Sequence, residues 1–405
     1  MEEITNIKIS ELCTKVCSGG TPKSSVPSYY DGNIPWLNTK EINFNRIYST
    51  EKSITEDGLN NSSAKWIDKN AVIVAMYGAT AGKTAISKIP LTTNQACCNL
   101  MINADKADYR FVYYALVSEY NRLASLANGG AQQNLNAQQI KDFEIPFFSL
   151  KDQKRIAKIL STLDDKIELN RRINDNLEQQ AQALFKSWFV DFEPFKDGKF
   201  VESEMGMIPE GWKYIKLGKL CESVSITHPQ KTGKLIFLNT GDIECGMVNK
   251  HNYMNINEMP GQAKKSIKEN DILYSEIRPC NKHYAFVNFS ADQYIVSTKL
   301  MVIRTYNNNS LRIYQFVTRK EIIDLLQHEA ESRSGTFPQI RFDNISDLDI
   351  LLATEPIEKQ YSHLISGIYN KIFKNELEIS KLQQLRDCIL PKLMSGELKI
   401  NDLNC

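Results

Sequence analysis

The chain carries the same long segment twice. Residues 129–192 hold a glycine-rich loop, a short apolar run and then apolar residues at helical spacing, and residues 334–396 repeat this succession. A period of this length is too long for a solenoid and is the length of a domain with an appendage. The sequence therefore predicts two copies of one unit, each ending in its own long helix.

Short matches between the two copies extend over the whole chain. They are Ile7-Lys8 with Ile215-Lys216, Leu37-Asn38-Thr39 with Leu238-Asn239-Thr240, Asn70 with Asn270, Leu100-Met101 with Leu300-Met301, and Ile140 with Ile345. The offset drifts, which indicates a longer loop at residues 18–32 of the first copy and a longer stretch before Gly335 in the second. The duplication thus includes the globular parts as well as the helices.

The first long helix is predicted over residues 150–190, which contain no proline or glycine. Its inward positions alternate at spacings of 4 and 3, as in a coiled-coil seam. The seam is Ile156, Leu160, Leu163, Ile167, Asn170, Asn174, Leu177, Ala181, Leu184 and Trp188. Asparagine in a seam weakens packing but fixes register. A helix of this length needs a long partner surface to bury such a seam.

The second long helix is predicted to be that partner. Its seam is Ile365, Ile368, Ile372, Asn375, Ile379, Leu382, Ile389 and Leu393. Arg386 interrupts the pattern, and we expect the adjacent Leu385 to take the inward place. Pro391 is expected to end or kink the helix. Because the first helix leads from the first domain to the second, the second helix must run back, so the pair is predicted to be antiparallel.

These features predict an α+β fold. Two mixed α/β globular domains are separated by two long antiparallel helices, which form a coiled-coil spacer with a pseudo-twofold internal repeat. The predicted boundaries are 1–148 for the first domain, 149–190 for the first helix, 191–212 for a linker, 213–354 for the second domain, 355–396 for the second helix and 397–405 for a tail.

Composition excludes several classes of protein. No run approaches the ~18 apolar residues that span a bilayer, and the polar start Met1-Glu2-Glu3 is unlike a secretory signal. The nine cysteines are scattered, so we expect reduced thiols in a cytoplasmic protein without membrane contact. A net charge of +1 does not by itself indicate a nucleic-acid partner.

No catalytic or metal-binding set is recognisable. The stretch from Gly78 to Thr84 is one residue short of a P-loop, and the second copy has Arg278-Pro279-Cys280-Asn281-Lys282 there. A glycine turn between strands is favoured, and contact with DNA phosphate or bases stays open. The five histidines are too dispersed for a metal site or a catalytic triad. We expect a chain that is not an enzyme and holds neither metal nor cofactor.

Three stretches carry a family resemblance: ALFKSWFVDFEP at 183–194, GMIPEGW at 206–212 and LPKLMSGEL at 390–398. With the order of parts along the whole chain, they resemble the specificity subunits of type I restriction–modification systems. The resemblance implies two target recognition domains, each reading one half of a bipartite double-stranded DNA site. It implies that the helices set the distance between the half-sites, and that this subunit is not catalytic.

The same resemblance implies partner proteins. Two copies of an adenine methyltransferase (modification) subunit would dock on the repeated helical surface and carry S-adenosylmethionine. A larger ATP-dependent restriction and translocation subunit would join the complex. Because the loops of the two domains differ in sequence, the two half-sites are expected to differ as well.

The DNA-binding candidates are polar and cationic residues in the predicted loops after strands, where side chains suit base edges and phosphates. In the first domain they are Lys40, Tyr77, Thr80, Lys83, Asn94, Gln95, Gln132, Gln133 and Asn134. In the second they are Thr240, Ser275, Arg278, Asn281, Lys282, Ser297, Thr298, Lys299, Arg333, Ser334 and Thr336. Arg278, Lys282 and Arg333 are favoured because a long cation serves phosphate and guanine equally well.

The partner-binding candidates are the aromatic residues near the end of the first helix. They are Phe185, Trp188, Phe189 and Phe192. Aromatic residues often anchor interfaces, but burial against the second domain or the returning helix is an equal alternative. Two other functions stay open. One is a coiled-coil scaffold with two protein-binding domains. The other is a stand-alone DNA methyltransferase or nuclease, against which the missing catalytic set argues.

Overall fold

The computed structural model describes residues 5–127, 134–306, 309–333 and 338–398. The chain forms two compact units, which we treat separately. Unit 1 comprises residues 1–169 and 378–405, and unit 2 comprises residues 170–377. The helices α5 (Leu150–Phe189) and α9 (Glu355–Met394) each have 40 residues and contribute to both units. The first half of α5 and the last part of α9 belong to unit 1, and the remainder of both belongs to unit 2.

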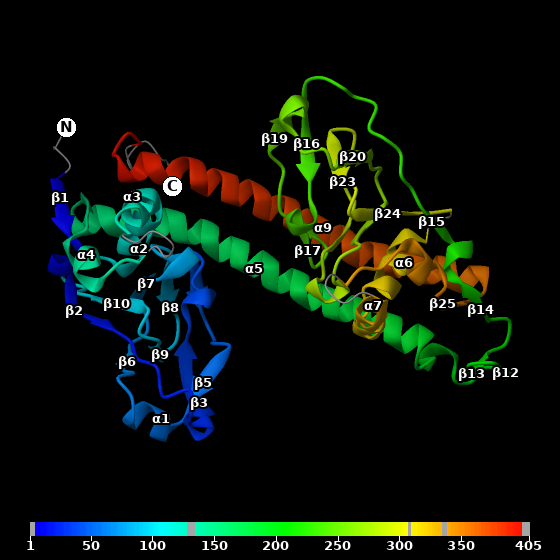
Figure 1. Cartoon of the computed structure of the whole chain (residues 1–405), viewed down its shortest axis with the longest axis horizontal. Helices are drawn as coiled ribbons and strands as arrows, with labels where there is room; N and C mark the ends of the chain where they lie inside the picture. Colours follow the sequence, from blue (N-terminus) through cyan, green and yellow to red (C-terminus); the bar gives the residue numbers. More distant parts are fainter. Residues whose placement is uncertain (1–4, 128–133, 307–308, 334–337, 399–405) are drawn as a thin grey trace. The chain divides into compact units, whose positions relative to one another are not determined.

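Unit 1 holds a two-stranded, a five-stranded and a four-stranded sheet, in the orders β1-β11, β2-β10-β7-β8-β4 and β5-β3-β9-β6 (Figure 1). The strands are β1 (Thr5–Lys8), β2 (Cys13–Ser18), β3 (Tyr30–Leu37), β4 (Asn45–Ile47), β5 (Lys52–Ile54), β6 (Trp66–Ile67), β7 (Val72–Ala75), β8 (Thr84–Ser87), β9 (Leu91–Thr93), β10 (Cys97–Ile102) and β11 (Glu144–Phe147). The short helices are α1 (Glu56–Asn60), α2 (Tyr109–Ser118), α3 (Tyr120–Ser125) and α4 (Ala137–Asp142).

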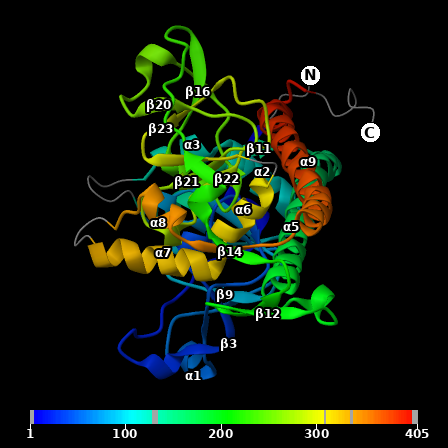
Figure 2. The same ribbon diagram turned by 90° about the vertical axis from the view of Figure 1, so that its right-hand side faces the viewer.

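Unit 2 repeats the two-stranded sheet as β14-β25 and the four-stranded sheet as β19-β16-β23-β20. In place of the five-stranded sheet it has the four strands β15-β24-β21-β22, without a counterpart of β4 at the edge, and it adds the hairpins β12-β13 and β17-β18. The strands are β12 (Phe200–Ser203), β13 (Gly206–Pro209), β14 (Lys213–Lys216), β15 (Cys221–Ser223), β16 (Lys234–Leu238), β17 (Ile243–Glu244), β18 (Met247–Val248), β19 (Tyr253–Asn255), β20 (Ala263–Ser266), β21 (Ile272–Ser275), β22 (Tyr284–Phe286), β23 (Tyr294–Ser297), β24 (Leu300–Thr305) and β25 (Asp349–Leu352). The helices are α6 (Ser310–Val317), α7 (Lys320–Arg333) and α8 (Phe342–Ser346). Asn344 of α8 donates to Glu329 of α7 at 2.5 Å, and Figure 2 shows these two helices side by side.

Strand pairing confirms that the globular parts are duplicated. In unit 1, β3 pairs in parallel with β9 and antiparallel with β5. In unit 2, β16 pairs in parallel with β23 and antiparallel with β19. In the other large sheet of each unit, β7 and β21 are central strands that are antiparallel to both neighbours. Every residue of these two strands is buried, which explains why they are mainly apolar runs rather than alternating patterns. The linker predicted at 191–212 is ordered and contains the β12-β13 hairpin.

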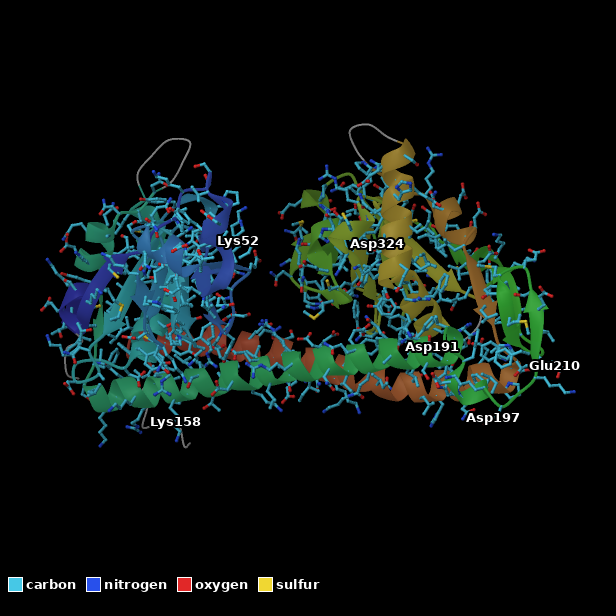
Figure 3. The ribbon with its side chains drawn as sticks, turned by 90° about the horizontal axis from the view of Figure 1, so that it is seen from below. Lys52, Lys158, Asp191, Asp197, Glu210 and Asp324 are labelled. Atoms are coloured by element: carbon cyan, nitrogen blue, oxygen red, sulfur yellow. The ribbon has the colours of Figure 1, made fainter. Side chains whose placement is uncertain are left out.

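The seam of α5 is buried as its spacing predicts. All ten of its positions are buried or half-buried, whereas Lys158, between two of them, is exposed on the face of α5 turned away from the sheets of unit 1 (Figure 3). Within unit 1, Ile156 and Leu160 pack in one apolar cluster with Leu390 and Leu393 of α9. Early residues of α5 therefore meet late residues of α9, as an antiparallel pair requires.

The same pairing continues within unit 2 through polar contacts. Asn375 donates to the side-chain oxygen of Asn174 at 2.8 Å, and Asn174 donates to the carbonyl of Ile372 at 3.4 Å. Tyr369 of α9 donates to Glu178 of α5 at 3.3 Å. Inward asparagines that bond across the helix pair oppose sliding of one helix along the other, because a shift would leave buried amides unpaired.

The expectation for Leu385 is wrong, and Pro391 lies inside α9. Leu385 is 48% exposed, so it does not replace Arg386 in the seam. Arg386 itself faces α5 and forms an ion pair with Asp164 at 2.8 Å. Pro391 does not end the helix, which continues to Met394. The last turn places Leu393 and Met394 in the core of unit 1, and this burial offsets the hydrogen bond that proline removes.

Polar contacts tie the globular part of each unit to the helix pair. In unit 1, Arg46 of β4 bonds to Asp165 and lies 3.5 Å from Glu168, both on α5. In unit 2, Gln315 of α6 donates to the carbonyl of Ala181 at 3.0 Å. The sheets and the helices therefore form one body within each unit. None of the helices in the described part of the chain combines the length and apolar character needed to cross a membrane.

We predict that the buried cation of unit 2 is essential to its stability. Arg312 is 1% exposed, lies 2.9 Å from Glu358, bonds to the carbonyl of Leu351 and has its guanidinium 4.1 Å from the ring centroid of Phe189. Arg312→Ala strands the buried carboxylate and is expected to cost about 3–5 kcal/mol of unfolding free energy, measured by urea denaturation.

The double variant Arg312→Met with Glu358→Met removes both charges together and should recover most of that loss. The control is Lys359→Ala, because the Lys359–Glu355 pair is exposed on both sides and should change stability by less than about 0.5 kcal/mol. An Arg312→Ala variant as stable as the control would contradict this account.

A second prediction concerns a pair of carboxylates in the helix pair. Burial, followed by the nearby charge of Glu178, raises the pKa of Glu376 from 4.5 to about 7. Between these pH values the folded chain holds a proton that the unfolded chain releases, so stability falls as pH rises through this window. Because the side chain is only half-buried, Glu376→Gln should raise the unfolding free energy at pH 8 by about 1–2 kcal/mol, and should be neutral at pH 4.5.

Thermal melts across this pH range measure the effect. Glu378→Gln is the matched control, because Glu378 is more exposed and lies 3.5 Å from Lys166. If the melting temperature of the wild type changed with pH in the same way as that of Glu376→Gln, Glu376 would have an ordinary pKa in the folded chain.

Candidate nucleic-acid interface

The candidate interface of unit 1 is a set of loops at the ends of its central strands. We call this set the first loop row, and it consists of residues 38–43 after β3, 76–83 between β7 and β8, 94–96 after β9, and 134–135. Backbone bonds join the four segments. They run from Asn94 N to Leu37 O (3.0 Å), from Met76 N to Ala96 O (2.8 Å) and from Leu135 N to Met76 O (2.7 Å).

Unit 2 builds the same arrangement from different residues. The second loop row consists of residues 239–243 after β16, 276–283 between β21 and β22, 298–299 after β23, and 339–340. Its bonds run from Glu276 N to Lys299 O (3.0 Å) and from Ile340 N to Glu276 O (2.9 Å). Loops that contact a ligand while a rigid sheet holds their ends are a common solution for recognition sites.

Most of the first-domain candidates lie at the surface of the first loop row. Lys40 and Gln95 are exposed, Asn134 is exposed and forms a β-bridge with Tyr77, and Tyr77 is 44% exposed. Thr80 is half-buried and donates to the carbonyl of Tyr77 at 3.3 Å. The structure thus brings together an aromatic ring, amides and a cation, which are groups that suit base edges and phosphates.

The Lys83 side chain is not free to contact DNA, because it is engaged within unit 1. Its ammonium donates to the side-chain oxygen of Asn43 at 2.8 Å, and the side chain is half-buried. This bond ties the turn after β7 to the segment after β3. Lys83 therefore holds two parts of the loop row together.

In unit 2, Arg278, Asn281 and Lys282 are exposed in the turn between β21 and β22. Thr240, Thr298 and Lys299 are half-buried in the neighbouring loops. Arg333 is the last residue of α7, and its side chain lies outside what is described. Gln132, Gln133, Ser334 and Thr336 also lie outside the described residues.

Three candidates are buried, and we correct their assignment. Asn94 is 8% exposed and accepts from the backbone N–H of Ala96 at 3.1 Å. Ser275 and Ser297 are 2% and 0% exposed, and their hydroxyls accept from backbone N–H groups two residues ahead. Short polar side chains at strand ends satisfy the backbone of their own turns, so these residues shape the loops and do not offer groups to a ligand.

Sequence reasoning missed the residues that set the first turn of each loop row. Asn38 and Glu41 form a reciprocal cap around residues 39–41, and Asn239 and Asp242 do so around residues 240–242. The available signal was an asparagine followed three residues later by an acid, in both copies. Lys265 was missed as well. It donates to the carbonyls of Thr298 and Leu300, and burial lowers its pKa.

The aromatic candidates for partner contact are core residues. Phe185, Trp188 and Phe189 are 4–7% exposed in the apolar cluster of unit 2, and the Phe189 ring lies 4.7 Å from that of Tyr361 and 5.6 Å from that of Trp212. Phe192 is half-buried against the same cluster. The alternative of burial therefore holds, because the start of α9 and the β12-β13 segment cover this end of α5.

Comparison with known proteins was made on the whole chain. The family model described as "Type I restriction modification DNA specificity domain" matches residues 1–179 and 209–385. Each match includes one set of sheets and part of the long helix that follows it. The duplication found in the residues and in the strand orders is thus present in the family model as well.

Individual relatives agree with this match. The specificity subunit of the type I restriction enzyme MjaIX from Methanocaldococcus jannaschii is 29% identical, over 96% of this chain and 92% of that protein. That of HindI from Haemophilus influenzae is 36% identical over 44% of this chain and 39% of its own length. The crystal structure of a type I restriction–modification S subunit from M. genitalium superposes with a TM-score of 0.57 at 17% identity, covering 97% of each chain. This likeness confirms the fold class.

Proposed function

We propose, because the chain belongs to the type I restriction modification DNA specificity family, that each of its units reads one half of a bipartite double-stranded DNA site. Membership makes the chain a specificity subunit without catalytic activity of its own. The observation that supports half-site reading is the duplicated loop row. The two rows have the same backbone framework but carry different exposed side chains, which is what two readers of different sequences require.

The target is proposed to be asymmetric. Unit 1 offers Tyr77, Lys40 and Gln95, whereas unit 2 offers Arg278, Asn281 and Lys282. Aromatic and amide groups suit thymine methyls and adenine edges, and arginine suits guanine. Because the two rows expose different side chains among these residues, we expect the two half-sites to differ in sequence.

The helix pair is proposed to set the distance between the half-sites. Helix α5 includes residues of both units, as does α9. An α-helix rises ~1.5 Å per residue, so its length in residues is a measure of distance. The inward asparagines Asn174 and Asn375 keep the two helices in one register.

Two copies of an adenine methyltransferase subunit are proposed to dock on this helix pair. A surface that occurs twice in one chain can bind two identical partners in equivalent ways. The buried aromatic residues cannot supply the contact, but the helices carry exposed leucines, namely Leu169, Leu364, Leu377 and Leu385. S-adenosylmethionine would bind to the methyltransferase subunits and ATP to the restriction and translocation subunit.

We predict that exchanging one reader changes one half-site only. Residues 213–354 would be replaced by the corresponding part of a specificity subunit with another target, and methylated adenines would be mapped in genomic DNA. The second half-site should change, while the first half-site and the spacer length stay the same. Replacement of residues 1–148 is the reciprocal control.

A change in both half-sites would contradict independent reading. If deletion of this chain left the methylation pattern unaltered, the result would support the scaffold function instead. Methyl transfer to DNA by the purified chain alone would contradict the non-catalytic assignment.

A further prediction tests the spacer. Inserting one heptad after Arg171 in α5 and one after Glu376 in α9 lengthens both helices by the same amount and preserves the seam. The added ~10 Å should widen the gap between the half-sites by about three base pairs, with the half-sites unchanged. Mapping of methylated sites measures the new gap.

A three-residue insertion at both positions is the control, because it rotates the seams out of contact and should abolish activity. An unchanged gap in the heptad variant, with activity retained, would show that the helices do not set the spacing.

A further inference from the structure

The turn between β7 and β8 in unit 1 and the turn between β21 and β22 in unit 2 occupy corresponding places, although the short 3-10 helix is Gly78–Thr80 in the first and Pro279–Asn281, one position later, in the second. Both are closed by a bond from the fourth residue to the first, Ala81 N to Gly78 O at 3.0 Å and Asn281 N to Arg278 O at 2.9 Å. The strand bonds that flank them also correspond: Ala75 N to Lys83 O and Ser275 N to His283 O, both at 2.9 Å. Positions 78 and 82 of unit 1 are therefore equivalent to positions 278 and 282 of unit 2.

The backbone at both positions is left-handed in both units. Gly78 and Gly82 have φ values of 70° and 84°, and Arg278 and Lys282 have φ values of 43° and 55°. Glycine adopts this region without penalty, whereas a residue with a Cβ atom is strained there. Arg278 also precedes Pro279, which restricts its backbone further. Unit 1 has glycine at both of these left-handed positions, whereas unit 2 has a residue with a Cβ atom at both.

The strained turn is held by its surroundings rather than by the two cationic side chains. The Arg278 N–H donates to the carbonyl of Pro338 at 3.1 Å, and the Cys280 N–H donates to the side chain of Gln327 at 3.1 Å. The Arg278 and Lys282 side chains are exposed. Within the described residues, the ion pairs and side-chain hydrogen bonds of unit 2 do not involve either of them.

The residue after position 82 or 282, in contrast, has a side chain that is bonded within its own unit. Lys83 of unit 1 donates to Asn43, and its counterpart His283 has its Nδ1 atom 2.7 Å from the carbonyl of Ile243. These two side chains bind within their own unit. Arg278 and Lys282 are thus cations at positions that favour glycine, and among the described residues their side chains form no ion pair or hydrogen bond. Strain of this kind is typical of functional positions.

We propose that Arg278 and Lys282 determine recognition of the second half-site, an inference that rests on the proposed function. Arg278 contacts a guanine edge in the major groove, because its planar guanidinium matches the two acceptors of that base. Lys282, a compact charge on a flexible stem, contacts a DNA phosphate. The corresponding glycines leave unit 1 without these two contacts, so its half-site is read by other residues of the first loop row.

The test uses the full chain assembled with its methyltransferase subunits and DNA duplexes that vary one base pair at a time. Arg278→Gly should reduce discrimination at one G·C pair of the second half-site by about 10- to 100-fold and leave the first half-site unchanged. Arg278→Lys should keep affinity and lose the same discrimination. Lys282→Gly should weaken binding to all duplexes evenly and lower the slope of log affinity against log salt by about one.

Stability separates this proposal from simple damage to the turn. Because glycine suits the left-handed backbone, the melting temperatures of both glycine variants should not fall, and a rise of up to about 4 °C is expected. Asn270→Gly is the matched control. Asn270 has a φ of 71°, like its counterpart Asn70, and precedes β21 at the far end from the turn. It should change neither DNA discrimination nor the salt slope.

Several outcomes would overturn the proposal. They are unchanged discrimination in Arg278→Gly, an unchanged salt slope in Lys282→Gly, a fall in the melting temperature of either, or an equal loss of discrimination in Asn270→Gly. A wild-type complex without any sequence preference would instead overturn the proposed function. A selective wild type with unaffected variants would overturn only the roles of Arg278 and Lys282.

Discussion

The burial of the two long seams is the constraint on which the rest of the structure depends. A helix of 40 residues with an apolar face along its whole length is not stable alone in water. Each helix meets this constraint by giving one part of its seam to each unit. Ile156 and Leu160 enter the core of unit 1, and Ala181, Phe185 and Trp188 enter that of unit 2. The helices are thus part of both cores.

Polar contacts between the two long helices fix their register, which apolar burial alone does not determine. Leucine and isoleucine seams tolerate sliding by a heptad, but the Asn174–Asn375 bond, the Asp164–Arg386 ion pair and the Tyr369–Glu178 bond each fit one register. Glu376 has the opposite character, because burial raises its pKa and its charge is unfavourable there. The helix pair therefore combines contacts that fix its register with a carboxylate that reduces its stability at neutral pH.

Much of the fold was predictable because it depends on periodicity and repetition. The seam spacing predicted both helices, and the short matches between the copies predicted that the globular domains are duplicated. Burial of single residues was less predictable. Phe185, Trp188 and Phe189 have the composition of an interface anchor, and only tertiary packing against Tyr361 and Trp212 shows that they are core. Arg386 is inward for a reason that no helical pattern contains, namely a carboxylate on the partner helix.

The sequence predicted which loops form the candidate interface, but not which side chains in them are exposed. Most of the described candidates lie in loops after strands, but Ser275 and Ser297 are the last residues of β21 and β23. Asn94, Ser275 and Ser297 use their polar atoms to close their own turns. Burial separates these residues from Tyr77 or Arg278, and burial depends on contacts with segments distant in the chain. The strain at Arg278 and Lys282 was likewise invisible in the sequence, because it appears only when their turn is compared with the glycine turn of unit 1.

The composition of unit 1 from both ends of the chain has a consequence for biosynthesis. Its sheets and the first half of α5 are translated before unit 2, but Leu390, Leu393 and Met394, which complete its core, are translated only after unit 2. Until then the nascent domain lacks the residues that cover Ile156 and Leu160. A stop codon between positions 378 and 390 would therefore destabilise the domain that is translated first, while the residues that form the core of unit 2 would all be present.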